Sequence, residues 1–103
     1  MAYTVYETQS AECDIAEIIQ YLVENLGNTQ AAEKWLAEYE GVLKKLEEYP
    51  EMFEFSKVPG HRQRGFHRFL IGRYVVIYTI DDERKKVCIY RLFHGTRDYA
   101  RYL

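Results

Sequence analysis

The chain has 103 residues, a formal charge of −2 and 48% hydrophobic residues. This length predicts one domain, residues 1–103, with a modest core. No run approaches the about 20 apolar residues of a membrane-spanning helix, and no signal-peptide pattern is present, so we expect a soluble cytoplasmic protein. Cys13 and Cys88 have neither disulfide-framework nor metal-ligand spacing, so we expect reduced thiols and no metal or cofactor.

The charge is distributed unevenly along the chain. Residues 1–55 hold twelve acidic residues and three lysines, whereas residues 56–74 hold five basic residues and no acidic one. Residues 75–103 hold six basic and four acidic residues. This asymmetry indicates one face that meets an anion. The alternative, that solvent-exposed helix faces simply favour glutamate, stays open.

The chain begins with a short strand followed by an amphipathic helix. Residues 2–7 contain alternating tyrosine, threonine and valine, which favour a strand beside the rest of a sheet. Apolar residues spaced three and four apart then predict a helix. Thr8 or Ser10 can cap its start with a side-chain oxygen, and Gly27 suits a left-handed cap at its end.

A second amphipathic helix follows directly. Asn28 or Thr29 can cap its start, and Pro50 ends it because the residue before a proline is pushed out of the helical region. Each helix has a single apolar stripe, so the two helices form an antiparallel hairpin that must cover another element. Trp35 lies on the second stripe and is interpreted as a core anchor.

The second half of the chain predicts a loop and then a three-stranded meander. Residues 50–64 are interrupted by proline and glycine and predict an irregular segment with His61 at its surface. Three runs rich in β-branched and aromatic residues follow, namely Phe66–Ile71, Tyr74–Ile80 and Lys86–Phe93. Short polar connections make neighbouring strands antiparallel. The predicted fold class is α+β, with the helical hairpin packed on one face of the sheet.

Side-chain alternation predicts which residues lie on the face left open by the helices. Arginine is seldom buried without a partner, so Arg68 marks the open face in the first run. In the last run Val87 and Ile89 are assigned to the helix side, and the alternate residues to the open face: Cys88, Tyr90, Leu92 and His94. The open face is then expected to be basic and partly aromatic, and to suit phosphate through the planar guanidinium donors of its arginines, Arg68 and Arg97.

The element order resembles that of the RelE/ParE superfamily of bacterial type II toxins. Two segments carry the resemblance, FLIGRYVVIYTID at residues 69–81 and VCIYRLFHGTRDY at residues 87–99. The resemblance implies a growth-inhibiting toxin that is neutralised by a cognate antitoxin. It also implies one of two targets, because RelE-like members cleave mRNA on the ribosome whereas ParE-like members inhibit DNA gyrase. A degenerate module that only binds an antitoxin is a further alternative.

For a RelE-like endoribonuclease, the resemblance implies particular site residues. Metal-independent cleavage needs a base for the 2′-hydroxyl, cations around the phosphate and an acid for the leaving oxygen. The candidate catalytic residues are Arg68, His94, Arg97 and Tyr99, with Tyr102 as an alternative to Tyr99. The candidate substrate-binding residues are Lys57, Arg62, Arg64 and Arg91. Alternatively, Arg91 pairs with an acid such as Asp98, and Arg68 and Arg97 serve only the antitoxin interface.

Three departures from the nuclease pattern weaken the endoribonuclease interpretation and bring the gyrase alternative close to parity with it. The nuclease arginine on the middle strand corresponds to Val75, and the basic loop holds one lysine, Lys57, rather than a cluster. A nuclease that acts on the ribosome gains affinity from each phosphate contact and is usually strongly basic. The slightly negative formal charge of this chain does not fit that requirement.

Overall fold

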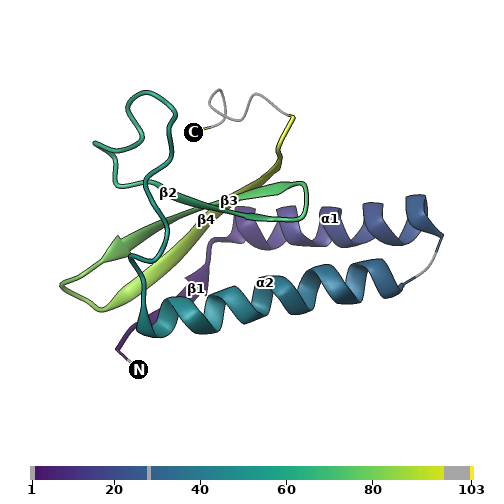
Figure 1. Ribbon diagram of the computed structural model, residues 1–103, viewed down its shortest axis with the longest axis horizontal. Coiled ribbons are helices and arrows are strands. Elements are labelled where there is room, and N and C mark those ends of the chain that lie inside the picture. The colour runs from purple at the N-terminus through teal and green to yellow at the C-terminus, as the bar shows by residue number, and fades with distance from the viewer. Residues whose placement is uncertain (1, 28, 97–102) are drawn as a thin grey trace.

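The helices and the sheet follow the predicted order. The computed structural model describes residues 2–27, 29–96 and 103. The elements are β1 (Thr4–Glu7), α1 (Gln9–Leu26), α2 (Gln30–Glu48), β2 (His67–Ile71), β3 (Tyr74–Asp81) and β4 (Lys86–His94). The two helices lie side by side along one face of the sheet (Figure 1). The predicted α+β fold, an N-terminal strand, a helical hairpin and an antiparallel meander, is confirmed.

The described strands form one sheet in the order β1-β4-β3-β2. The β2–β3 and β3–β4 pairs are antiparallel, as the short connections require. Strand β1 instead pairs in parallel with β4, with Thr4 opposite Lys86 and Glu7 opposite Ile89. The helical hairpin therefore lies in the connection between β1 and β2. The first strand, β1, forms one edge of the sheet and lies beside the last strand, β4.

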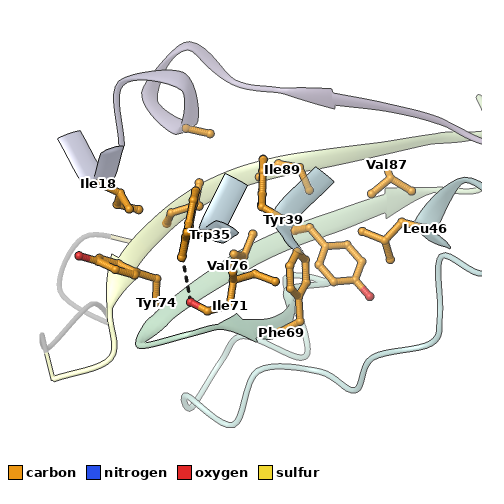
Figure 2. Close-up of a cluster of buried hydrophobic side chains, with 13 residues drawn as sticks. Ile18, Trp35, Tyr39, Leu46, Phe69, Ile71, Tyr74, Val76, Val87 and Ile89 are labelled. Carbon is orange, nitrogen blue, oxygen red and sulfur yellow. Dashed lines mark hydrogen bonds between the residues drawn. The ribbon is translucent and has the colours of Figure 1, made fainter. Parts of the chain in front are cut away.

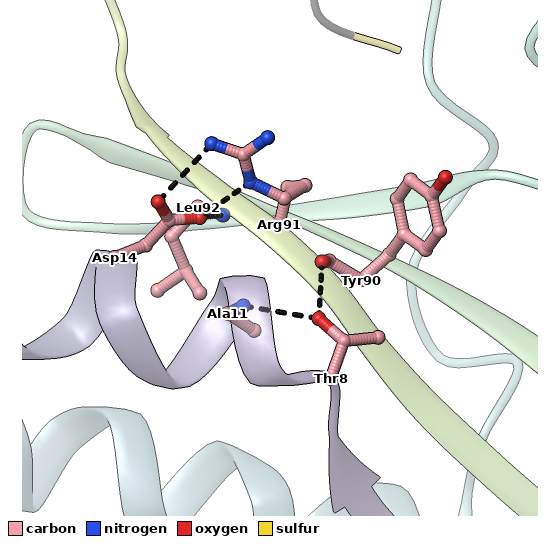
Figure 3. Close-up of polar contacts among 6 residues, drawn as sticks. All are labelled: Thr8, Ala11, Asp14, Tyr90, Arg91 and Leu92. Carbon is pink, nitrogen blue, oxygen red and sulfur yellow. Dashed lines mark hydrogen bonds and ion pairs between the residues drawn. The ribbon is translucent and has the colours of Figure 1, made fainter.

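The ends of α1 follow from its capping residues. Thr8 is the N-cap, and its side-chain oxygen accepts a hydrogen bond from the Ala11 amide at 3.0 Å. The same hydroxyl donates to the Tyr90 carbonyl oxygen at 2.8 Å, which fastens the helix start to β4 (Figure 3). Gly27 ends the helix with φ of 72°, in the left-handed region that glycine favours. Thr29 begins α2 without a side-chain cap bond.

The main core lies between the helices and the sheet. Trp35 and Tyr39 of α2 stack at a ring-centroid distance of 5.5 Å, and Trp35 meets Tyr74 edge-on. The indole Nε1 donates to the Ile71 carbonyl oxygen at 3.1 Å (Figure 2). Trp35 is 6% exposed, so the prediction that it anchors the core is confirmed. No helix in the described part of the chain is both long and apolar enough to cross a bilayer.

A β-bulge in β4 overturns part of the predicted face assignment. Ile77 pairs with Arg91 but the next residue, Tyr78, pairs with Ile89, so Tyr90 is an extra residue in β4. An extra residue reverses the in-and-out alternation of everything after it. Leu92 therefore joins the helix-side core, and the ring of His94 lies edge-on to core residue Tyr74. The prediction that Leu92 and His94 share the open face with Tyr90 and Cys88 is wrong for this reason.

The sheet face away from the helices is apolar at its centre. Val75 and Ile77 of β3 are buried there beneath Phe66, together with the partly buried residues Tyr90 and Leu103. Phe66 and Tyr90 lie 5.1 Å apart between ring centroids. Helices cover only one face, as predicted, but the expectation that the other face is an open basic surface is wrong at its centre. The Arg64 guanidinium lies over the Phe66 ring of this small cluster, 4.6 Å from its centroid.

Candidate functional site

Two of the candidate catalytic residues meet at one end of the sheet. Arg68 and His94 line a hollow of about 530 Å³, which we call the end hollow. Its other lining residues are Leu70, Gly72, Arg73, Val75, Gly95 and Thr96. The antiparallel meander explains this meeting, because the β2–β3 turn and the end of β4 lie at the same end of the sheet. Candidates Arg97, Tyr99 and Tyr102 lie outside the described residues.

A glycine brings the end of β4 against the β2–β3 turn. The Gly95 amide donates to the Arg73 carbonyl oxygen at 2.7 Å. A Cβ atom at Gly95 would lie 3.1 Å from the same oxygen, closer than side chains ordinarily approach. Only glycine fits this approach without displacement of the turn, and the contact sets the distance between Arg73 and the residues that follow β4.

The hydrogen bonds of His94 define what its ring can offer to a ligand. The Thr96 amide donates to His94 Nδ1 at 3.2 Å, and the Thr96 hydroxyl oxygen lies 2.7 Å from the same nitrogen. A backbone amide can only donate, so Nδ1 is the acceptor. The neutral ring therefore carries its proton on Nε2, which makes that nitrogen a hydrogen-bond donor.

The arginines of the end hollow lack acidic partners in the described part of the chain. Arg68 Nε is buried and has no hydrogen-bond partner among those residues. Arg73 is exposed and forms no ion pair there. The lining residues within 2–27, 29–96 and 103 include no aspartate or glutamate. The arrangement therefore offers donors and positive charge, which suits an oxyanion.

Arg91 is held in an internal ion pair. Its Nε and Nη2 atoms donate to the Asp14 carboxylate of α1 at 2.8 and 3.2 Å, and the Leu92 amide donates to the same carboxylate at 2.9 Å (Figure 3). The hydrogen bond to Asp14 raises the pKa of Arg91, outweighing the opposite effect of burial. The alternative that Arg91 pairs with an acid therefore fits the geometry, but that acid is Asp14 rather than the suggested Asp98. Arg91 is not among the residues that line the end hollow.

The three basic loop candidates lie apart from the end hollow. The guanidinium carbons of Arg62 and Arg64 lie 5.1 and 4.6 Å from the ring centroids of Phe55 and Phe66. Arg64 also donates to the Leu103 carbonyl oxygen. Lys57 Nζ lies 3.9 Å from a Glu54 carboxylate oxygen in an exposed pair. Arg64 contacts the apolar cluster through Phe66, whereas Lys57 and Arg62 line a separate hollow beside Phe55, so none of the three lies with Arg68 and His94.

Comparison with known families identifies the chain. Residues 5–99 match the family model described as the ParE toxin of the type II toxin–antitoxin system, parDE. The chain belongs to the ParE toxin family. It is thus a type II toxin of the RelE/ParE superfamily, as the resemblance implied. No curated protein matches the sequence.

Three solved toxin–antitoxin structures share the fold of this ParE-family chain. The RelBE2 complex of Mycobacterium tuberculosis aligns with a TM-score of 0.63 and 23% identity, over 91% of this chain and 99% of that chain. The chromosomal ParDE system of P. aeruginosa aligns with a TM-score of 0.69 and 18% identity, over 90% of this chain and 96% of that chain. The archaeal RelE–RelB complex of Pyrococcus horikoshii OT3 aligns with a TM-score of 0.55 and 23% identity, over 94% of this chain and 99% of that chain.

Sequence reasoning predicted only two of the eight described residues that line the end hollow in this ParE-family toxin, Arg68 and His94. Arg73, Gly95 and Thr96 were not among the predicted site residues, yet they line the hollow beside Arg68 and His94. A usable signal was present in the predicted topology. In an antiparallel meander, the turn between the first two strands lies at the same end as the finish of the third strand.

His61 is buried, which contradicts the expected surface position. It is 3% exposed, with Nδ1 2.8 Å from the Ser56 hydroxyl oxygen and its ring edge-on to Phe66. Burial lowers the pKa of His61, and the nearby Arg64 charge lowers it further. The loop is therefore packed around a neutral imidazole.

We expect the stability of this ParE-family toxin to depend on His61 as the pH falls. Unfolded His61 has an ordinary pKa of 6.5, so below that value the unfolded chain binds a proton that the folded chain resists. The stabilisation is complete above the ordinary pKa and is lost as the pH falls through the lowered one. Thermal unfolding of wild type and His61→Gln between pH 7.5 and 5 checks this. If the unfolding temperature fell equally steeply with pH in both proteins, His61 would not be the source of the pH dependence.

Proposed function

We propose that this chain inhibits growth by binding DNA gyrase, and that it does not cleave RNA. The observation that carries the proposal is the burial of Val75, which is 3% exposed and packs with Phe66 and Ile77. Val75 corresponds to the middle-strand arginine of the nucleases. A nuclease needs cations where the phosphate acquires charge in the transition state. Membership of the ParE family and the negative formal charge further support the proposal.

We also propose that a cognate antitoxin neutralises this toxin. The three solved structures with the same fold are described as toxin–antitoxin complexes or systems. The uneven distribution of charge along the chain supports such a partner, because residues 56–74 hold five basic residues and no acidic one. Co-purification of the chain with the product of an adjacent reading frame checks this proposal.

A supercoiling assay tests the proposed target. Purified chain is mixed with gyrase, ATP and relaxed plasmid, and the supercoiled product is measured as the chain is titrated. We expect a dose-dependent loss of supercoiling. Antitoxin that is mixed with the chain before gyrase is added should prevent this loss. Undiminished supercoiling at a large molar excess of correctly folded chain would contradict the proposal.

Ribosome-dependent mRNA cleavage is the second candidate function. The specific observation in its favour is that Arg68 and His94 line the same hollow. Primer extension on programmed ribosomes tests it, with His94→Ala as the variant that should lose cleavage. Intact message in the presence of wild type, together with inhibited gyrase, would exclude this candidate. Unaltered growth on expression would instead favour a module that only binds an antitoxin.

A further inference from the structure

We propose that the end hollow binds an acidic segment of a protein partner, with carboxylates on Arg68 and Arg73 and an apolar side chain against Leu70. The proposal deepens the proposed function, because it rests on the chain acting through protein partners. The end hollow joins the exposed turn after β2 to the end of β4, and it is open to a ligand from outside.

Charge is the first argument for this occupant. Among the described residues, the lining of the end hollow contains two arginines and a histidine, and no carboxylate. Three other cations of the described chain are each paired with an acid: Arg91 with Asp14, Arg84 with Asp81 and Lys57 with Glu54. Arg68 and Arg73 have no such acid in the described residues. A ligand carboxylate would supply the missing partner.

The unsatisfied donor of Arg68 is the second argument. Its Nε is buried, with no hydrogen-bond partner in residues 2–27, 29–96 and 103. A buried donor without an acceptor costs free energy, and a charged one costs more. A hydrogen bond from Arg68 Nε to a ligand oxygen would remove this cost. The unpaired donor of the unbound chain therefore favours binding of a ligand that supplies an acceptor.

Exposed apolar surface between the two arginines is the third argument. Leu70 is 58% exposed, although it lies within strand β2, with Arg68 two residues before it and Arg73 in the turn that follows. A large aliphatic side chain at such a position gains free energy when a partner removes it from water. A segment in which acidic residues flank an apolar one would satisfy the arginines and cover Leu70 together.

The same features argue against a nucleic acid as the occupant. Single-stranded nucleic acid is bound by aromatic stacking platforms along a positive groove, and among the described residues that line the end hollow His94 is the only one with a ring. Leu70 would gain nothing from a phosphate backbone.

Fluorescence anisotropy of the full chain tests the proposal with defined probes. The first probe is a labelled peptide in which leucines are flanked by glutamates, the second its glutamine counterpart, and the third a single-stranded RNA oligonucleotide. Arg68→Gln and Arg73→Gln are the test variants. Arg84→Gln is the matched control, because it removes the same charge from the exposed β3–β4 turn at the other end of the sheet. Circular dichroism verifies folding, and exposed Arg73 provides a variant that leaves the core intact.

We expect the glutamate peptide to bind and the glutamine peptide to bind about tenfold or more weakly, since hydrogen bonds to charged groups are the strong ones. Each test variant should weaken glutamate-peptide binding about tenfold, whereas Arg84→Gln should not. Equal binding of both peptides, equal effects of the test and control variants, or tighter binding of RNA that depends on Arg68 and Arg73 would overturn the proposal. Failure to inhibit gyrase would overturn the proposed function alone, because peptide binding is measured without gyrase.

Discussion

Replacement of Trp35 by alanine should lower the free energy of unfolding by about 3–5 kcal/mol, the range for removing a large aromatic side chain from a core. Trp35 stacks on Tyr39 of its own helix and joins α2 to both strands of the β2–β3 hairpin beside the turn: it meets Tyr74 edge-on and donates to the Ile71 carbonyl oxygen at 3.1 Å. Its removal takes away aromatic packing and a buried hydrogen bond together. Chemical denaturation followed by circular dichroism measures the loss.

Trp35→Phe is the matched control for this prediction. Phenylalanine keeps a ring against Tyr39 but cannot donate to Ile71, so we expect a loss clearly smaller than that of alanine. The difference between the two variants separates the packing contribution from that of the hydrogen bond. A loss below about 1 kcal/mol for Trp35→Ala would contradict the core role, because such small values are typical of surface sites.

Replacement of Asp14 by alanine should cost about 2–4 kcal/mol of unfolding free energy. The Asp14 carboxylate accepts hydrogen bonds from two Arg91 nitrogens and from the Leu92 amide, so its removal leaves three donors without an acceptor. It also separates α1 from β4 at the bulge. The midpoint of urea unfolding measures the effect.

Lys57→Ala serves as the control for a mere loss of an ion pair. Lys57 and Glu54 lie 3.9 Å apart and are both strongly exposed, and exposed pairs contribute at most about 1 kcal/mol. Arg91→Ala should also destabilise the chain, and the double variant Asp14→Ala with Arg91→Ala should lose less than the sum of the single losses. Strict additivity would show that the two side chains do not interact in solution.

Local signals predicted the elements because each depends on nearby residues. Thr8 caps α1 with its own hydroxyl, and Gly27 ends the same helix in a conformation that glycine reaches without strain. The apolar stripe with Trp35 likewise identified the buried side of α2. These features need only a few neighbouring residues, so the order of helices and strands could be predicted from the chain alone.

Features that depend on distant residues could not be predicted in this way. Alternation gives no sign that Tyr90 is a bulge residue, because its carbonyl is satisfied by Thr8, 82 positions away. The bulge places Leu92 on the helix side and lets Arg91 reach Asp14. His61 looked like a loop residue because its burial depends on how the loop folds over Phe66. The roles of Arg97 and Tyr99 remain predictions.

Parallel pairing of the first strand with the last has a consequence for biosynthesis. While the nascent chain is still on the ribosome, β1 has no strand to pair with until β4 has been translated. Contacts between residues so far apart form only after a large loss of chain entropy, which slows folding. Toxicity should therefore arise only after β4 has left the ribosome, and premature termination before β4 should yield a harmless product.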